Sequence, residues 1–205
     1  MKALVLKQYH QLAVEEAPAP PVAADEVLVR VKACGICGSD VHGVDGSTGR
    51  RRPPIIMGHE AAGTIERAGP AVSGWKAGDR VTFDSTIWCG VCRHCRRGEI
   101  NLCDDRRVLG VSCAEYRRDG AFAEFVAVPA RVLYRLPDSL PFEEAALVES
   151  LSIAVHAAAR LPVRLGDTAL VVGAGTIGLL AIQALKARGC TLVAAADVAP
   201  ERLEL

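Results

Sequence analysis

Four closely spaced cysteines constrain this chain more than any other feature. They form a Cys-x-x-Cys-x-x-Cys-x7-Cys array that consists of Cys89, Cys92, Cys95 and Cys103. Thiolates so close in sequence can all reach one ion at about 2.3 Å, and four sulfur ligands in a tetrahedron suit Zn²⁺ with no coordination position left open. The spacing therefore predicts a structural zinc site. His94 lies inside the array, and we expect it to be a bystander because four thiolates already fill the shell.

The alternatives for the cysteine array are a set of disulfides or a solvated loop. The chain opens Met1-Lys2-Ala3 with no apolar signal segment, which favours a reducing, cytoplasmic location and free thiols. Lys plus Arg and Asp plus Glu both number 24, so we expect no nucleic-acid partner. The uncharged run 168–185 approaches the length of a membrane span, but glycines interrupt it, and we expect no membrane span either.

The fold class predicted from the pattern is α/β, with a first part that is rich in strands. Val27, Val29 and Val31 alternate with other residues as in a strand with one buried face. Frequent turns favour a compact, barrel-like fold, and helical character begins near Pro141 and runs through Ala159. We place one domain at residues 1–150 and a second at 151–205. The strands expected in the first domain are 2–6, 12–16, 27–32, 58–67 and 121–128.

A second group of metal-binding residue types precedes the cysteine array. Cys37 lies on a glycine-flanked turn, and His59 and Glu60 follow Gly58 side by side. Taken singly, a lone Cys or a His-Glu pair is usually structural. Taken together, they suggest a mixed sulfur, nitrogen and oxygen set, which would leave a position for water or substrate, as in a catalytic zinc site.

A dinucleotide-binding fingerprint occupies the last part of the chain. Residues 168–172 read as a buried strand, Gly-Ala-Gly-Thr-Ile-Gly follows at 173–178, and 179–188 reads as a helix closed by Gly189. In such a motif the first glycine permits the tight turn, the second lets the backbone approach the pyrophosphate, and the third lets helix and strand pack closely. The predicted cofactor-binding residues of this turn are Gly173, Gly175, Thr176, Ile177 and Gly178.

An acid follows the fingerprint at the end of a second apolar strand, 191–196. Asp197 lies 19 residues beyond Gly178, where a carboxylate would accept hydrogen bonds from an adenosine ribose hydroxyl. This carboxylate repels a 2′-phosphate, so it predicts NAD rather than NADP. The alternative for Asp197 is a helix-capping acid before Pro200.

Five motifs together resemble the zinc-dependent medium-chain dehydrogenase/reductase superfamily, and within it the polyol dehydrogenases. They are Cys-Gly-Ile-Cys-Gly-Ser-Asp at 34–40, Gly-His-Glu at 58–60, the array at 89–103, Arg-Arg-Asp-Gly-Ala-Phe-Ala-Glu at 117–124, and Gly-Ala-Gly-Thr-Ile-Gly at 173–178. The resemblance implies a GroES-like barrel catalytic domain followed by the first portion of a Rossmann fold. Only two strands of the Rossmann fold can be counted, so we expect these residues to be an incomplete enzyme.

The resemblance also implies roles for single residues. It makes Cys37, His59 and Glu60 the ligands of a catalytic zinc. Glu149 falls where polyol enzymes hold a Glu near the metal and ordinary alcohol dehydrogenases use a Cys, although the usual Glu-Pro reads Glu149-Ser150 here.

Further positions match the family outside the metal ligands. Ser39 matches the hydroxyl that passes the alcohol proton toward the cofactor ribose, and His42 lies where some relatives continue that relay. Arg202 matches an Arg that packs by the adenosine. We interpret the cysteines without a ligand match as reduced packing residues: Cys34, Cys113 and Cys190.

The implied function is oxidation of a secondary alcohol of a polyol or related small alcohol to a ketone, with two zinc ions per chain and NAD. A dimer or tetramer is implied for a complete chain. Other readings stay open: a primary-alcohol, threonine or butanediol dehydrogenase, a zinc-free quinone reductase, or an inactive zinc-binding fragment. The sequence does not select the substrate. Three consecutive arginines, 50–52, are interpreted as an exposed, solvated loop, with contact to a substrate phosphate as the alternative.

Overall fold

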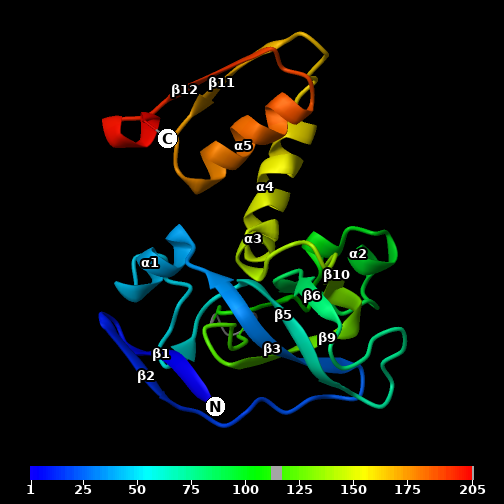
Figure 1. Ribbon diagram of the computed structural model, residues 1–205. Helices are drawn as coiled ribbons and strands as arrows, with labels where there is room; N and C mark the ends of the chain where they lie inside the picture. Colours follow the sequence, from blue (N-terminus) through cyan, green and yellow to red (C-terminus); the bar gives the residue numbers. More distant parts are fainter. Residues whose placement is uncertain (112–116, 205) are drawn as a thin grey trace. The chain divides into compact units, whose positions relative to one another are not determined.

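The chain divides into two compact units. The computed structural model describes residues 1–111 and 117–204, and the units are Met1–Leu147 and Val148–Leu205. The first unit is built mainly from strands, and the second from helices and a parallel strand pair (Figure 1). The α/β class and the strand-rich first part are therefore as predicted.

An antiparallel five-stranded sheet forms the centre of the first unit, in the order β10-β6-β5-β3-β9. Its longest strands are β3 and β5, which pair along nearly their whole length from Val27↔Ala68 to Gly35↔Glu60. Valines and isoleucines enter the core here because β-branched side chains pack well on a pleated surface. The strands are β3 (Glu26–Gly35), β5 (Glu60–Ala68), β6 (Arg80–Phe83), β9 (Phe125–Pro129) and β10 (Leu133–Arg135).

The prediction of one buried face for β3 holds only in part. Val27 and Val29 are buried in the main core, but Leu28 between them is also buried. The first half of β3 is therefore covered on both faces, whereas the half-exposed residues lie further along it. The strand expected at 121–128 begins later, at Phe125, and within 121–124 Ala123 makes an isolated bridge to Ala3.

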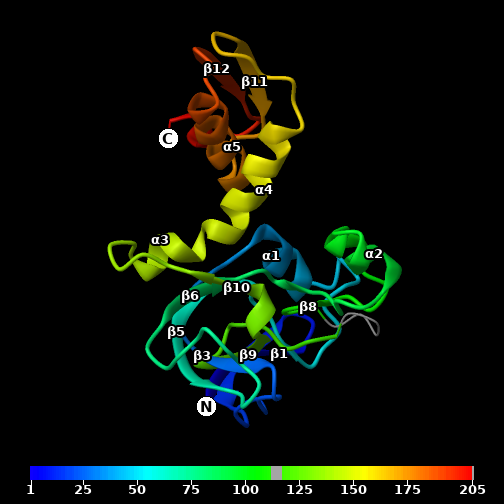
Figure 2. The same cartoon turned by 90° about the vertical axis from the view of Figure 1, so that its right-hand side faces the viewer.

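Smaller sheets and short helices complete the first unit. The helix α1 (Gly38–Val44) directly follows β3, α2 (Arg93–Arg96) lies in the cysteine segment, and α3 (Phe142–Ala146) ends the unit. Figure 2 shows α2 projecting from the body of this unit. The remaining strands are β1 (Lys2–Gln8), β2 (Gln11–Glu16) and β4 (Ile55–Ile56) in one sheet, and β7 (Thr86–Ile87) with β8 (Arg107–Val108) in another.

The second unit is a strand, helix, strand arrangement preceded by one further helix. The strands pair in parallel from Thr168↔Leu192 to Val172↔Ala196. A small core of Ala158, Ala184, Leu185 and Cys190 joins the two helices and the sheet. The elements are α4 (Val148–Ala159), β11 (Thr168–Val172), α5 (Thr176–Ala187), β12 (Leu192–Ala196) and the short 3-10 helix Pro200–Leu203.

Two boundaries differ from the sequence prediction. The Ala-rich helical run is interrupted at Leu147, where α3 ends and α4 begins at the next residue. The helix α5 begins at Thr176 because Gly175, within the glycine turn, already serves as its N-terminal flanking residue. The segment after Pro200 is a 3-10 helix. Among the described residues, no helix is both long enough and apolar enough to cross a membrane.

Candidate metal centres and dinucleotide site

The pairing of β3 with β5 brings the mixed sulfur, nitrogen and oxygen group together. Gly35 and Glu60 are partners in this ladder, so Cys37, two residues beyond β3, meets His59, which directly precedes β5. Ligand atoms of Cys37, His59 and Glu60 all lie within 4.8 Å of one another. His59 and Glu60 are buried. A thiolate, an imidazole and a carboxylate at this separation can hold one Zn²⁺ and leave a coordination position open.

Glu60 reaches this group only because residue 35 has no side chain. A Cβ built on Gly35 would lie 2.5 Å from Glu60 Oε2 and 3.2 Å from Glu60 Cβ. The first distance is shorter than any real side-chain contact and the second is tight, so a larger residue would displace the carboxylate. The glycine at the end of β3 therefore has a packing reason, namely the close approach of the Glu60 side chain.

A buried carboxylate, that of Asp40, connects the candidate ligands. Asp40 is 1% exposed, and its Oδ2 accepts a hydrogen bond from the Cys37 amide at 3.2 Å. Its Oδ1 lies 3.6 Å from His59 Nδ1. That contact is an ion-pair distance and not a hydrogen bond, and His59 Nδ1 has no hydrogen-bond partner within the described part of the chain. With Nδ1 facing a carboxylate, Nε2 is the ring nitrogen available to a metal.

The electrostatics of the group favour a cation. Burial opposes charge on His59, but Asp40 and Cys37 outweigh it and raise the pKa of His59 to about 10. The His59 imidazole in turn lowers the pKa of the Cys37 thiol, with help from Ser39 and against burial. Burial alone would raise the pKa of Asp40, but His59 and Arg51 outweigh it and hold that pKa below its usual value. The group therefore favours a positive charge at this place, and its sulfur, nitrogen and oxygen donors fit Zn²⁺.

Two residues at this site escaped the sequence analysis. Asp40 was part of a quoted motif but was given no role. An acid at the third helical position, three residues after the N-cap residue Cys37, is a known capping pattern. Arg51 was interpreted as part of an exposed loop, and this was wrong. It is 4% exposed and lies 3.3 Å from Asp40 Oδ1, whereas Arg50 and Arg52 are exposed as expected.

The predicted proton-relay residues lie on α1. Ser39 is half-buried close to Cys37 in the chain, and its Oγ accepts a hydrogen bond from Arg51 at 3.1 Å. His42 is exposed in the last turn of α1. Glu149 lies in the first turn of α4, in the second unit. The roles of Ser39, His42 and Glu149 stay predictions.

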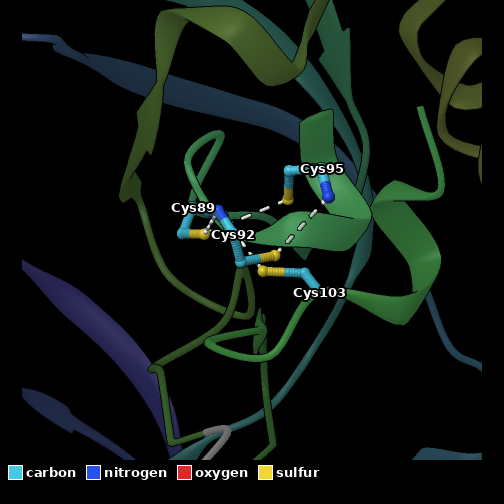
Figure 3. A group of neighbouring side chains, drawn as sticks. All are labelled: Cys89, Cys92, Cys95 and Cys103. Atoms are coloured by element: carbon cyan, nitrogen blue, oxygen red, sulfur yellow. Dashed lines mark hydrogen bonds between the residues drawn. The ribbon is translucent and has the colours of Figure 1, made fainter. Parts of the chain in front are cut away.

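The four cysteines of the array converge on one point (Figure 3). Their sulfurs all lie within 4.8 Å of one another, and Cys89 Sγ is 4.0 Å from Cys95 Sγ. A tetrahedron with zinc–sulfur bonds of about 2.3 Å has edges of about 3.8 Å. The array is therefore close to the size that Zn²⁺ requires.

Backbone amides prepare the array for negative charge. The amides of Cys92 and Val91 donate to Cys89 Sγ, and the Cys95 amide donates to Cys92 Sγ. The Cys95 amide is the main cause that lowers the pKa of Cys92 to about 6, whereas burial raises the pKa of Cys95 to about 12. Neighbouring thiolates repel one another, so full deprotonation needs a cation at the centre.

His94 behaves as a bystander in the described contacts. Its Nδ1 lies 2.9 Å from Glu99 Oε2, and its Nε2 accepts a hydrogen bond from Arg93 at 3.3 Å. Of the other cysteines, Cys34 is partly buried and Cys190 is buried, and both are free thiols. Cys113 lies outside the described residues.

The glycine turn between β11 and α5 has the expected dinucleotide-binding geometry. Gly173 has φ +102°, which favours glycine. A Cβ on Gly178 would collide with the carbonyl oxygen of Gly173, so the third glycine lets the helix approach the turn. Thr176 and Ile177 open the first turn of α5, where free amides and the helix dipole suit an anion.

Asp197 makes the capping contact that the sequence offered as one alternative, and its role toward the ribose stays a prediction. Its Oδ1 accepts from the Ala199 amide at 2.9 Å, as in a capping turn before Pro200. Its Oδ2 accepts from the Ala174 amide at 2.7 Å, which fixes the glycine turn. Arg202 lies 3.6 Å from the same oxygen. These partners lower the pKa of Asp197, the Ala199 amide most, and the carboxylate keeps lone pairs for a further donor.

Comparison with known proteins decides the family. The model of the alcohol dehydrogenase GroES-like domain matches residues 23–138, more than half of the chain. The chain belongs to this family. The family match covers the strands of the main sheet, the mixed-ligand group and the cysteine array, so it spans both candidate metal centres.

Proteins similar to this chain include polyol and alcohol dehydrogenases. The chain is 40% identical to sorbitol dehydrogenase of Bacillus subtilis (strain 168) over its whole length and 58% of the relative. It is similar to galactitol-1-phosphate dehydrogenase from Escherichia coli, with 33% identity, TM-score 0.91, and coverage of 100% and 57% of the two chains. An alcohol dehydrogenase from Escherichia coli CFT073 complexed with NADH gives 36% identity and TM-score 0.89, with coverage of 100% and 58%. The chain thus spans somewhat more than half the length of these relatives.

We predict that the two metal centres respond differently to loss of one sulfur. In the whole protein, Cys92→Ser should lose one of two zinc ions and lower Tm by about 5 °C or more, because the array closes its own segment. Cys37→Ser should lose the other zinc with a smaller change in Tm. Elemental analysis and calorimetry measure both. Equal effects of the two substitutions on Tm would contradict the division into a structural and an open site.

Gly35→Ala tests the close approach of Glu60. The added methyl group should displace the carboxylate and weaken zinc binding at the mixed site by about tenfold or more. Competition with a chelator measures this affinity. Gly38→Ala is the matched control on the same turn, because a Cβ there meets nothing within 4 Å. Equal zinc affinity in the two variants would show that Glu60 does not depend on Gly35.

Proposed function

We propose that the protein is an NAD-dependent zinc dehydrogenase that oxidises a secondary alcohol of a polyol or related small alcohol to a ketone. The observation that carries this proposal is the grouping of Cys37, His59 and Glu60, with Ser39 beside it, in a chain of the GroES-like family. A four-sulfur site alone would support only a zinc-binding fragment. The mixed group supplies the open metal site that such a fragment lacks.

The residues of this site would share the reaction as follows. Zinc, when bound by Cys37, His59 and Glu60, supplies a Lewis acid that makes an alcohol easier to deprotonate near neutral pH. Ser39 would accept the proton of the alcohol hydroxyl and pass it on toward the cofactor ribose, with His42 as a further carrier. NAD, when bound, would supply the acceptor for the hydride from the alcohol carbon, so that loss of the proton and the hydride gives the ketone.

The cofactor half of the proposal rests on the turn after β11. The amides of this turn and of the first turn of α5 would hold the pyrophosphate, and Asp197 would accept from the adenosine ribose. Arg202, beside Asp197, would pack by the adenosine. The nicotinamide would supply the oxidising chemistry, and the protein would position the substrate and cofactor and exclude water. Glu149 is proposed to act near the metal, as in the polyol enzymes that the chain resembles.

The proposed reaction predicts that the whole protein reduces NAD in the presence of a polyol and that Ser39→Ala lowers kcat by about 10²-fold or more. Absorbance of NADH measures this across sorbitol, xylitol, a phosphorylated hexitol, threonine, butanediol and a primary alcohol. Ser73→Ala, at an exposed position of the same unit, is the control. Zinc in both sites without oxidation of any of these alcohols would contradict the proposal.

Asp197 generates a separate prediction on cofactor choice. Its carboxylate repels the 2′-phosphate of NADP at a cost of about 1 to 4 kcal/mol for charges within about 4 Å. Asp197→Ala should therefore narrow the preference for NAD over NADP, as measured by the ratio of kcat/KM values. Loss of the bond to Ala174 would weaken binding of both cofactors together, so it cancels from the ratio. The ratio then reports the hydrogen bonds to the ribose of NAD together with the repulsion of the 2′-phosphate. A wild-type ratio near one, or one that favours NADP, would rule out Asp197 as the selector.

A further inference from the structure

Arg51 is the one buried Lys or Arg side chain in the described part of the chain. It is 4% exposed, while its neighbours Arg50 and Arg52 are exposed. Burial of a guanidinium is costly unless charged and polar partners compensate for lost water. The position of Arg51 therefore calls for an explanation beyond its membership of a basic loop.

The partners of Arg51 are both on α1, next to the candidate metal ligand Cys37. One guanidinium nitrogen, Nη2, donates to Ser39 Oγ at 3.1 Å and to Asp40 Oδ1 at 3.3 Å. The same Asp40 oxygen faces His59 Nδ1 at 3.6 Å. Arg51 thus touches the proposed proton acceptor directly and a proposed metal ligand through one carboxylate.

The fold provides a path for this side chain. A Cβ on Gly43 of α1 would collide with Arg51 Cγ, and it would lie 3.4 Å from Met57 Sδ. Gly43 is buried, and its lack of a side chain lets the Arg51 stem cross the helix. The placement of the guanidinium therefore depends on Gly43 in α1 as well as on the segment that contains Arg51. A specific packing contact has this property.

The chemistry of the guanidinium restricts what Ser39 can do. Arginine has five N–H donors and no acceptor, so Ser39 Oγ must accept from Arg51. The serine hydroxyl hydrogen then has to point away from Arg51, toward the Cys37 sulfur, whose pKa Ser39 lowers, or toward a substrate oxygen. The positive charge also balances Asp40, so that the carboxylate can face the His59 ring without an excess of buried negative charge.

We propose that Arg51 is a positioning residue for the proposed reaction: it orients the Ser39 hydroxyl directly and the His59 ring through Asp40. This inference rests on the proposed function for its first half. The second half concerns metal binding alone and holds whether or not the alcohol is the substrate. The two halves can be tested separately in the whole protein.

The test for the metal half is the rate at which a chelator removes zinc. Arg51→Met, which has no charge, should release the zinc of the mixed site about tenfold faster or more. The zinc of the cysteine array should leave at the wild-type rate and serves as the reference within each sample. Gly43→Ala should act like Arg51→Met, because the added methyl group displaces the Arg51 side chain. Alanine favours the helical conformation, so the helix itself should stay intact. Arg52→Met, at the exposed neighbour, is the control with wild-type rates.

The test for the hydroxyl half is a double-mutant cycle with Ser39→Ala. If Arg51 acts through Ser39, the losses in kcat from Arg51→Met and Ser39→Ala should be far from additive. Arg51→Met should also raise the solvent isotope effect on kcat, because proton transfer becomes slower, and leave the KM for NAD unchanged. Arg51→Lys keeps a positive charge near Asp40, but its side chain is one bond shorter than the path to Nη2, the single nitrogen that serves both Ser39 and Asp40. It should restore slow zinc release and leave kcat low.

The outcomes separate this inference from the proposed function. Failure of the wild-type protein to oxidise any alcohol would refute the proposed function, and zinc release would then decide the role of Arg51 alone. Wild-type zinc release in both Arg51→Met and Gly43→Ala would overturn the link to His59. Additive losses in the cycle would overturn the link to Ser39. If Arg51→Met does not fold, Gly43→Ala gives the zinc-release comparison and Arg51→Lys gives the kcat comparison in the double-mutant cycle.

Discussion

The candidate catalytic site depends on one buried carboxylate. Asp40 is almost fully buried, and both of its oxygens have partners, since one accepts from the Cys37 amide and the other faces Arg51 and His59. A carboxylate without such partners would not stay ionised in this setting. Because Asp40 is in the first turn of α1, it joins the end of β3 to the start of β5. The geometry of the three candidate ligands follows from this junction.

The two metal centres differ in what their surroundings provide. The cysteine array gathers four sulfurs within one short segment and supports them with its own amides, so its geometry is local. The ligands of the mixed group come from the ends of two paired strands that are well separated in sequence. Asp40 contacts Cys37 and His59, and Arg51 contacts Asp40. A closed site of the first kind stabilises a fold, whereas an open site of the second kind can bind a substrate.

The features that could be predicted from the sequence are those that depend on the spacing of residues close together in the chain. The cysteine array, the glycine turn after β11 and the first two strands all follow from residues close together in the chain. The strand predicted at 58–67 is β5, shifted by two residues at its start. Local pattern also explains why α5 begins earlier than predicted, since its first turn overlaps the glycine motif.

The burial of Arg51 shows where local pattern fails. Three consecutive arginines favour a solvated loop, and two of them are exposed. The middle one is buried because Gly43 leaves a path and Asp40 offers a charge, and both lie several residues upstream on α1. No window of sequence around 50–52 contains that information. The same holds for Glu60, whose access to the group depends on the absence of a side chain at Gly35.

A crystal structure of the whole zinc-loaded protein, with anomalous diffraction recorded on both sides of the zinc absorption edge, tests the central claim most directly. We predict two zinc peaks, one among the four array sulfurs and one bonded to Cys37, His59 and Glu60, with Asp40 between the His59 ring and Arg51. A single peak in the array, with Asp40 and Arg51 unchanged beside a metal-free Cys37, would contradict the claim.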